Sequence, residues 1–368
     1  MPRLIGFTPL WGKLEPDQTK WPRVLWPLLR LWQRALYDPR PNMIDNKLRT
    51  REWEVLRSQN RYGQALLCYL GPPSHVLWNI KLPLFFCMLV AALSIMWEEL
   101  KARPFPFLPS IDPEHTVLRA WRRSAFVISL VLSLRISRGY DRWWQARCSF
   151  GGTVECATRL VIQATSYFAD PHLVDELARW ATVWMYSIYS MVVQQKKLTP
   201  EAEALLTPEE LHLYTYGPKS RQVVNIRMQQ IVHEAALSDD LMQMMDQQLS
   251  RMSQDAGYCS RIRFNTLPFG LVLFNSGMMW TWLLIAPFGL WKHNNWFPLL
   301  PYFFLIVLVL GCDEVASQLE DAFAHIPCRD ILEVGVRDIK KTLHDAAELK
   351  RLGARRLQQL KEARPKAD

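Results

Sequence analysis

The sequence predicts an all-α membrane protein with four transmembrane helices, continued by a helical domain on the inside of the membrane. Three observations lead to this prediction. The chain contains apolar segments that are nearly free of charge, and its Lys and Arg residues lie mostly on one side of those segments. No stretch alternates apolar and polar residues as a half-buried β-strand would, whereas the long polar connection has helical spacing.

The composition excludes several classes of protein. Hydrophobic residues make up 49% of the 368 residues and aromatic residues 12%, which is too much for an intrinsically disordered chain. The seven cysteines include no CxxC pair, so we expect neither a zinc site nor a disulfide framework. The net charge of +9 is compatible with nucleic acid, an anionic membrane face or a small anion as partner.

Three segments have the length and polarity of transmembrane helices. Residues 76–97 hold one charge, Lys81, near the start, where its side chain can reach the interface. Residues 264–291 are longer, and their interior polar residues are uncharged. Residues 297–312 carry no charge, and the short polar connection 292–295 joins these last two spans as a helical hairpin.

The fourth predicted span, residues 119–138, is unusual. Its apolar run is short and is bounded by Arg122, Arg123 and Arg135. Such a helix suits a position shielded from lipid by neighbouring helices, around a pore or a cavity.

The distribution of basic residues predicts the topology. Four spans place both termini on one side, and 37 of the 44 Lys and Arg residues then lie on that side, as expected for the inside. The predicted organisation is therefore an N-terminal inside segment (1–72), a membrane body (73–312) with inside helices between its second and third spans (139–263), and a C-terminal helical tail on the inside (313–368).

Two motifs follow each other, one in the second span and one just after it. Phe126, Leu130 and Leu134 are spaced at i, i+4 and i+8, so they stack along one face of the helix, either as an ordinary packing stripe or as the lining of a passage. Residues 140–147 then read Tyr-Asp-Arg-Trp-Trp-Gln-Ala-Arg, which alone is also compatible with an interfacial belt of aromatic and basic residues.

The second motif resembles the signature of the bestrophin family of anion channels, with Gln145 in place of Glu. The signature positions are Tyr140, Asp141, Arg142, Trp143, Trp144 and Arg147. Residues 265–269 are similar to the apolar-Pro step at the start of the family's third span. Residues 311–323 are similar to its acidic Pro-Phe element, with Ala322 replacing Pro.

The resemblance implies a homopentamer that conducts chloride passively through one central pore. In that family three apolar residues of the second span form a hydrophobic neck, and they correspond here to Phe126, Leu130 and Leu134. A second, inner constriction corresponds to Leu267. No catalytic residue, metal or cofactor is implied.

A hydrophobic neck suits an anion. It can gate by dewetting, and the positive edge of the Phe126 ring is a weak anion partner. Five copies of Arg135 or Arg138 just below the neck would attract anions. The alternative is that these arginines form ordinary ion pairs with Asp141 or other nearby acids.

One departure from the family concerns calcium. Animal members have an acidic clasp after the Pro-Phe element, whereas residues 321–330 lack that acidic run and include Arg329, which has the wrong sign for a calcium ligand. The chain is therefore more similar to plant, algal and bacterial members. The basic stretch 49–61 resembles the plant type, which favours a thylakoid or other internal membrane over the plasma membrane.

Two alternative functions stay open: a bicarbonate or nitrate channel, and a non-conducting membrane scaffold whose inside domain binds partners. An enzyme is not expected, because the sequence contains no HExxH and no glycine-rich phosphate loop. The sequence contains no basic run interleaved with aromatic residues, so we do not expect a nucleic-acid partner. The expected partners are chloride and similar small anions, the lipid bilayer and further copies of the chain.

Overall fold

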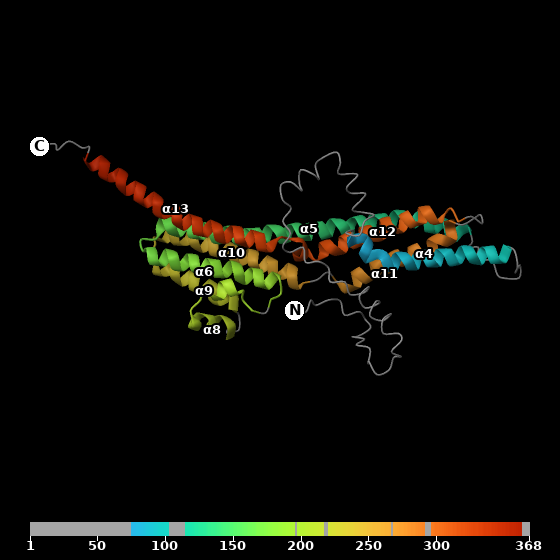
Figure 1. Cartoon of the computed structure of the whole chain (residues 1–368), viewed down its shortest axis with the longest axis horizontal. Coiled ribbons are helices and arrows are strands. Elements are labelled where there is room, and N and C mark those ends of the chain that lie inside the picture. The colour runs from blue at the N-terminus through green and yellow to red at the C-terminus, as the bar shows by residue number, and fades with distance from the viewer. Residues whose placement is uncertain are drawn as a thin grey trace.

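The computed structural model describes residues 75–102, 115–195, 197–216, 220–265, 268–290 and 296–362, and these residues contain helices but no β-strand. Figure 1 shows an elongated molecule. The helices are α4 (His75–Ala102), α5 (His115–Tyr167), α6 (Pro171–Val192), α7 (Pro200–Glu203), α8 (Pro208–Tyr216), α9 (Ser220–Glu234), α10 (Asp239–Phe264), α11 (Phe269–Leu290), α12 (Leu299–Glu320), the 3-10 turn η3 (Ala322–His325) and α13 (Cys328–Glu362).

One half of the molecule has the character of a membrane domain. Within the described residues, three segments are long and apolar enough to cross a bilayer: Asn79–Trp97, Gly270–Phe288 and Leu299–Glu320. They belong to α4, α11 and α12, which lie together at the right of Figure 1. These segments match three of the four predicted spans.

The fourth span is the first part of α5, a single helix of 53 residues. At about 1.5 Å per residue it extends roughly 80 Å, and it runs through both halves of the molecule (Figure 1). Ile128 and Leu132 are buried in the same apolar core as residues of α4, α11 and α12. Because α5 contains no proline, nothing ends the helix where it leaves the predicted span.

The second half of α5 contributes to the core of the inside domain. Its buried residues, such as Phe150 and Leu160, pack with α6, α9, α10 and α13 in a separate apolar core. The turn to α6 follows from local sequence, because the Asp170 carboxylate accepts a hydrogen bond from the His172 backbone at 2.9 Å and Pro171 starts the helix.

The C-terminal helix α13 begins beside the membrane domain and ends at the far end of the molecule from α4 and α11 (Figure 1). Its last turns carry the basic pairs Lys350-Arg351 and Arg355-Arg356, which are exposed. These charges are therefore remote from the bilayer that α4 and α11 are suited to cross.

Candidate functional site

The three residues predicted to form a neck share an exposed face of α5. Phe126 is 74% exposed, Leu130 48% and Leu134 54%. No other part of the described chain covers them, whereas Ile128 and Leu132 on the opposite face are buried. The exposed face must therefore meet lipid, another subunit or a passage.

The exposed face of α5 differs in polarity from the exposed faces of the other membrane helices. Within residues 121–138 it includes several polar or charged side chains. They are Arg122, Arg123, Ser129, Ser133, Ser137 and Arg138. The exposed face of α12, in contrast, presents Leu300, Phe304 and Leu308, which suit hydrocarbon. The face of α5 is thus less suited to lipid than the face of α12.

Arg135 does not lie on that face. Its guanidinium forms an ion pair with Asp313 and a second one with Glu320, at 2.9 Å, both on α12, and its side chain is only 7% exposed. The charge is thereby compensated inside the chain. Arg135 therefore forms ion pairs with acidic side chains, which was the alternative expectation. It is not available to attract anions, as the first expectation required.

Arg138 is arranged differently. It is exposed, and within the part of the chain that the structure describes no carboxylate pairs with it. Asp141, the expected alternative partner of these arginines, is also exposed. Of the two predicted anion attractors, only Arg138 is available to solvent or to an ion.

Arg142 of the signature binds the ends of two helices. Its guanidinium donates to the carbonyl of Glu320 at 3.1 Å, to that of Asn265 at 2.8 Å and to that of Ile262. The last carbonyls of a helix have no partner within the helix, so a cation that donates several hydrogen bonds satisfies them. Arg142 therefore ties α5 to the ends of α10 and α12.

Gly139 allows α5 and α12 to approach closely between these two arginines. A Cβ atom on Gly139 would lie 3.0 Å from the Cβ of Leu319 and 3.3 Å from the carbonyl oxygen of Ala316. Arg135, Gly139 and Arg142 are spaced by four and three residues, so they share one face of α5. We call these three residues the α12-facing anchor.

The aromatic residues of the signature lie beside the anchor. Tyr140 and Trp144 are about half exposed, and Trp143 packs against the inside core. The ring centroids of Tyr140 and Trp143 are 5.9 Å apart, and those of Trp143 and Trp144 are 6.3 Å apart. Arg147 is half-buried beside Gly151.

The predicted inner constriction, Leu267, lies outside the described residues. The acidic partners of the anchor were not predicted. Asp313 and Glu320 belong to the segment that resembles the acidic family element, but nothing in their pattern pairs them with Arg135, which is 178 and 185 residues away. A second contact at this level, Arg263 with Asp321 at 2.9 Å, was not predicted either.

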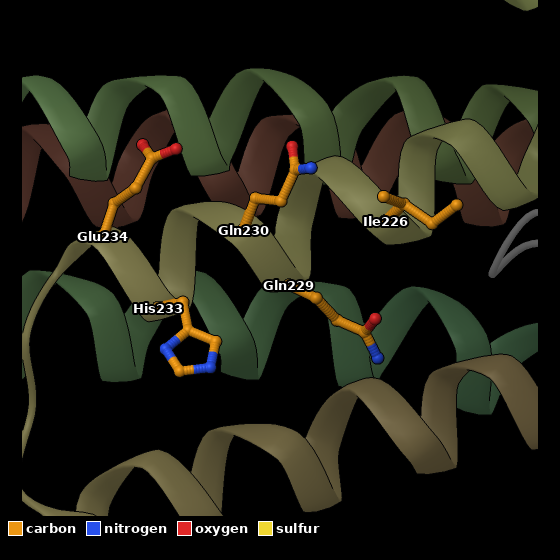
Figure 2. A pocket seen from close by; sticks show the side chains of 5 residues that line it. All are labelled: Ile226, Gln229, Gln230, His233 and Glu234. Atoms are coloured by element: carbon orange, nitrogen blue, oxygen red, sulfur yellow. The ribbon is translucent and has the colours of Figure 1, made fainter.

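In the described ranges, no group of three or more His, Cys, Asp or Glu side chains is placed to hold a metal. A surface hollow along α9 is lined by Ile226, Gln229, Gln230, His233 and Glu234. Figure 2 shows that His233 and Glu234 point to different sides of this helix, so they do not form an acid–base pair. The Glu234 carboxylate instead pairs with Arg227 at 2.7 Å.

Two proteins named as anion channel-forming proteins are similar in sequence to this chain. A voltage-dependent anion channel-forming protein of Mesorhizobium japonicum is 24% identical over 200 residues, which are 53% of this chain and 64% of that protein. Another from Escherichia coli K12 is 24% identical over 205 residues, 53% of this chain and 66% of that protein. The chain thus matches less than two thirds of the length of each relative.

Solved structures share the fold. One point mutant of a bacterial bestrophin homologue from Klebsiella pneumoniae has a TM-score of 0.63 at 17% identity, and the match covers 72% of this chain and 98% of that chain. A second point mutant of a bestrophin homologue from this organism has a TM-score of 0.64 at 17% identity, covering 72% of this chain and 99% of that one.

The family assignment rests on a match to more than half of the chain. Residues 55–344 match the family described as Bacterial/Fungal Bestrophin protein. This confirms the resemblance that residues 140–147 predicted. Together with the three apolar helices, it makes the chain an integral membrane protein. The chain belongs to the family of bacterial and fungal bestrophin proteins.

Proposed function

We propose that this chain forms a passive anion channel rather than an enzyme, with Phe126, Leu130 and Leu134 as a hydrophobic neck. The observation that carries the proposal is the exposed face of α5. It joins apolar side chains to serines and arginines within one membrane helix, and a face of this kind is better suited to water and ions than to lipid. The names of the relatives agree with anion conduction.

The proposed assembly is a homopentamer in which five copies of α5 surround one axis. In this arrangement the neck residues would face the pore, while the apolar faces of α4, α11 and α12 would meet lipid. The mass of the detergent-solubilised protein tests the assembly. Native mass spectrometry should find five copies of the 43.0 kDa chain, and a monomer would contradict the proposal.

Chloride is the proposed main ion, with nitrate and bicarbonate as related candidates. The five exposed copies of Arg138, one helical turn beyond Leu134, would raise the local anion concentration at the inner end of the neck. Leu267 stays the predicted inner constriction. The preference for a thylakoid or other internal membrane also stays a prediction from sequence, and the location of the tagged protein in its own cells would test it.

The neck is tested by conductance in a planar bilayer. Replacing Phe126, Leu130 and Leu134 with Ala should widen the neck and change single-channel conductance, gating or anion selectivity. A matched control lies on α12, where Leu300, Phe304 and Leu308 have the same spacing and similar exposure. Their triple Ala variant should behave as wild type. Equal effects of the two triple variants would contradict a neck on α5.

A second candidate function, the non-conducting scaffold, has a distinct outcome. A scaffold would give a folded oligomer with no current at either polarity, and the two triple variants would be indistinguishable. Recording at both polarities matters, because the matched relatives are named voltage-dependent.

A further inference from the structure

Two serines lie on the same line along α5 as the neck residues, one just before Leu134 and one beyond it. Ser133 follows Phe126 by seven residues and Ser137 follows Leu130 by seven, and seven residues make about two helical turns. All four side chains are exposed. From Phe126 to Ser137 the helix rises about 16 Å, and the two hydroxyls lie at the inner end of this line, one on each side of Leu134.

These two hydroxyls differ from those of the other serines in the span. The Ser124 hydroxyl donates to the Trp121 carbonyl at 2.6 Å, and the Ser129 hydroxyl donates to the Ala125 carbonyl at 2.6 Å. Such bonds within the helix are how serine is usually satisfied there. Ser133 and Ser137 make no side-chain hydrogen bond to any residue that the structure describes.

An unsatisfied hydroxyl on the surface of a membrane helix needs a partner. Facing lipid, each hydroxyl would lose its hydrogen bonds to water without replacement. A serine hydroxyl rotates freely and can donate one hydrogen bond, so it is suited to water or to an anion. The neighbouring exposed guanidinium of Arg138 adds positive charge at the same level of the helix.

We propose that Ser133 and Ser137 of each subunit form rings of hydroxyl donors at the inner end of the neck, where they replace part of the hydration shell of a small anion. This inference rests on the proposed function. It makes the two serines determinants of selectivity. Chloride holds its hydration water more tightly than thiocyanate, so chloride loses more free energy when it enters an apolar neck. Hydroxyl donors offset part of this loss. They therefore favour the passage of chloride more than that of thiocyanate.

The first test asks whether the two positions face an aqueous path, and it needs no current. Ser133→Cys and Ser137→Cys are made in a Cys148→Ala background, because Cys148 is an exposed native thiol. Vesicles are treated with a charged methanethiosulfonate. Both thiols should react roughly ten-fold faster than that of Leu308→Cys on α12, because the reaction needs a thiolate in water. Rates as slow as that of the Leu308→Cys control would overturn the proposal.

The second test measures the hydroxyl itself. The permeability of thiocyanate relative to chloride, from bi-ionic reversal potentials, should rise roughly three- to ten-fold in the Ser133→Ala/Ser137→Ala double variant, because hydrogen bonds to the ion are lost. Ser124→Ala is the matched control, because the Ser124 hydroxyl bonds within the helix and does not lie on the exposed face of α5, and it should leave the ratio unchanged. The Ser133→Thr/Ser137→Thr variant keeps both hydroxyls and should retain a ratio near wild type.

The outcomes separate this inference from the proposed function. Anion conduction with a permeability ratio unchanged in the double Ala variant would overturn the role of the serines and leave the channel intact. A cation-selective wild type would overturn both proposals. If the wild type carries no current, the thiol reaction still decides whether the serines line an aqueous path.

Discussion

Arg135 of α5 and Asp313 of α12 form an ion pair that is almost closed to solvent, with 7% of the Arg135 side chain exposed. Glu320 binds the same guanidinium about two turns further along α12. The pair fixes the candidate pore helix against the last membrane helix at the level where both leave the membrane domain. Because the pair is buried, removing one partner would leave a buried charge without compensation and lower the stability of the protein.

Replacing Arg135 with Ala should destabilise the protein strongly. Two acidic side chains would remain without their cation, and a broken buried pair costs about 3 to 5 kcal/mol. The measurement is thermal unfolding of the detergent-solubilised protein. The control is Arg159→Ala, because Arg159 is 57% exposed and pairs only with Glu155 on its own helix, within the residues that the structure describes. That change should cost less than about 1 kcal/mol. Similar losses in both variants would contradict the anchor.

A larger residue at Gly139 should separate α5 from α12. Valine would place its side chain against Leu319, where even a Cβ atom is already at 3.0 Å, and overpacking of this kind costs about 1 to 3 kcal/mol. Gly257→Ala on α10 is a suitable control, because no described atom outside the adjoining backbone of its own helix lies within 4 Å of its added Cβ. That variant should be neutral or more stable by up to about 1 kcal/mol. A Gly139→Val variant as stable as wild type would show that the two helices are not in tight contact.

The Arg142→Lys variant should loosen the end of α10 even though it keeps the charge. A lysine ammonium cannot reproduce the planar fork that reaches the carbonyls of Ile262, Asn265 and Glu320. Hydrogen exchange should speed up for the backbone amides around residues 262–265 and stay unchanged in the middle of α6. Unchanged exchange at both places would mean that charge alone holds these helix ends.

Stability should fall in acid through Glu210, which lies in the inside domain. Two hydrogen bonds from Arg179 lower the pKa of the Glu210 carboxyl, and the Thr207 backbone adds a third. A lowered pKa means that the carboxylate contributes its full stabilisation above the ordinary glutamate value, about 4.3. This stabilisation is lost as the pH falls through the lower folded-state value.

The check is the pH dependence of unfolding for Glu210→Gln. The variant should lose stability at pH 7 and become equal to wild type in acid, so the difference between the two proteins should shrink as the pH falls. A difference that stays constant with pH would contradict the ion pair as its source.

The membrane helices were predictable from sequence because hydropathy is a local property. Residues 76–97 and 297–312 are recognisable by their near or complete lack of charge, and α4 and α12 contain most of them. The exposed stripe of Phe126, Leu130 and Leu134 was also predictable, because helical spacing alone places these residues on one face.

The anchor was not predictable, because it joins residues far apart in the chain. The charge of Arg135 suggested an anion attractor beside the neck, yet the position points about 180 degrees away from Phe126 on an ideal helix, toward α12. Only the packing of α5 on α12 decides that two acidic side chains meet it there. Arg138, three residues later, turns away from α12 and stays exposed.

The reversal potential of single channels under a chloride gradient tests the central claim most directly. Purified wild-type protein in a planar bilayer, with potassium chloride at different concentrations on the two sides, should give a reversal potential near the equilibrium value for chloride. A reversal potential near the value for potassium would contradict the account, because the apolar and basic lining proposed for α5 would then be conducting cations.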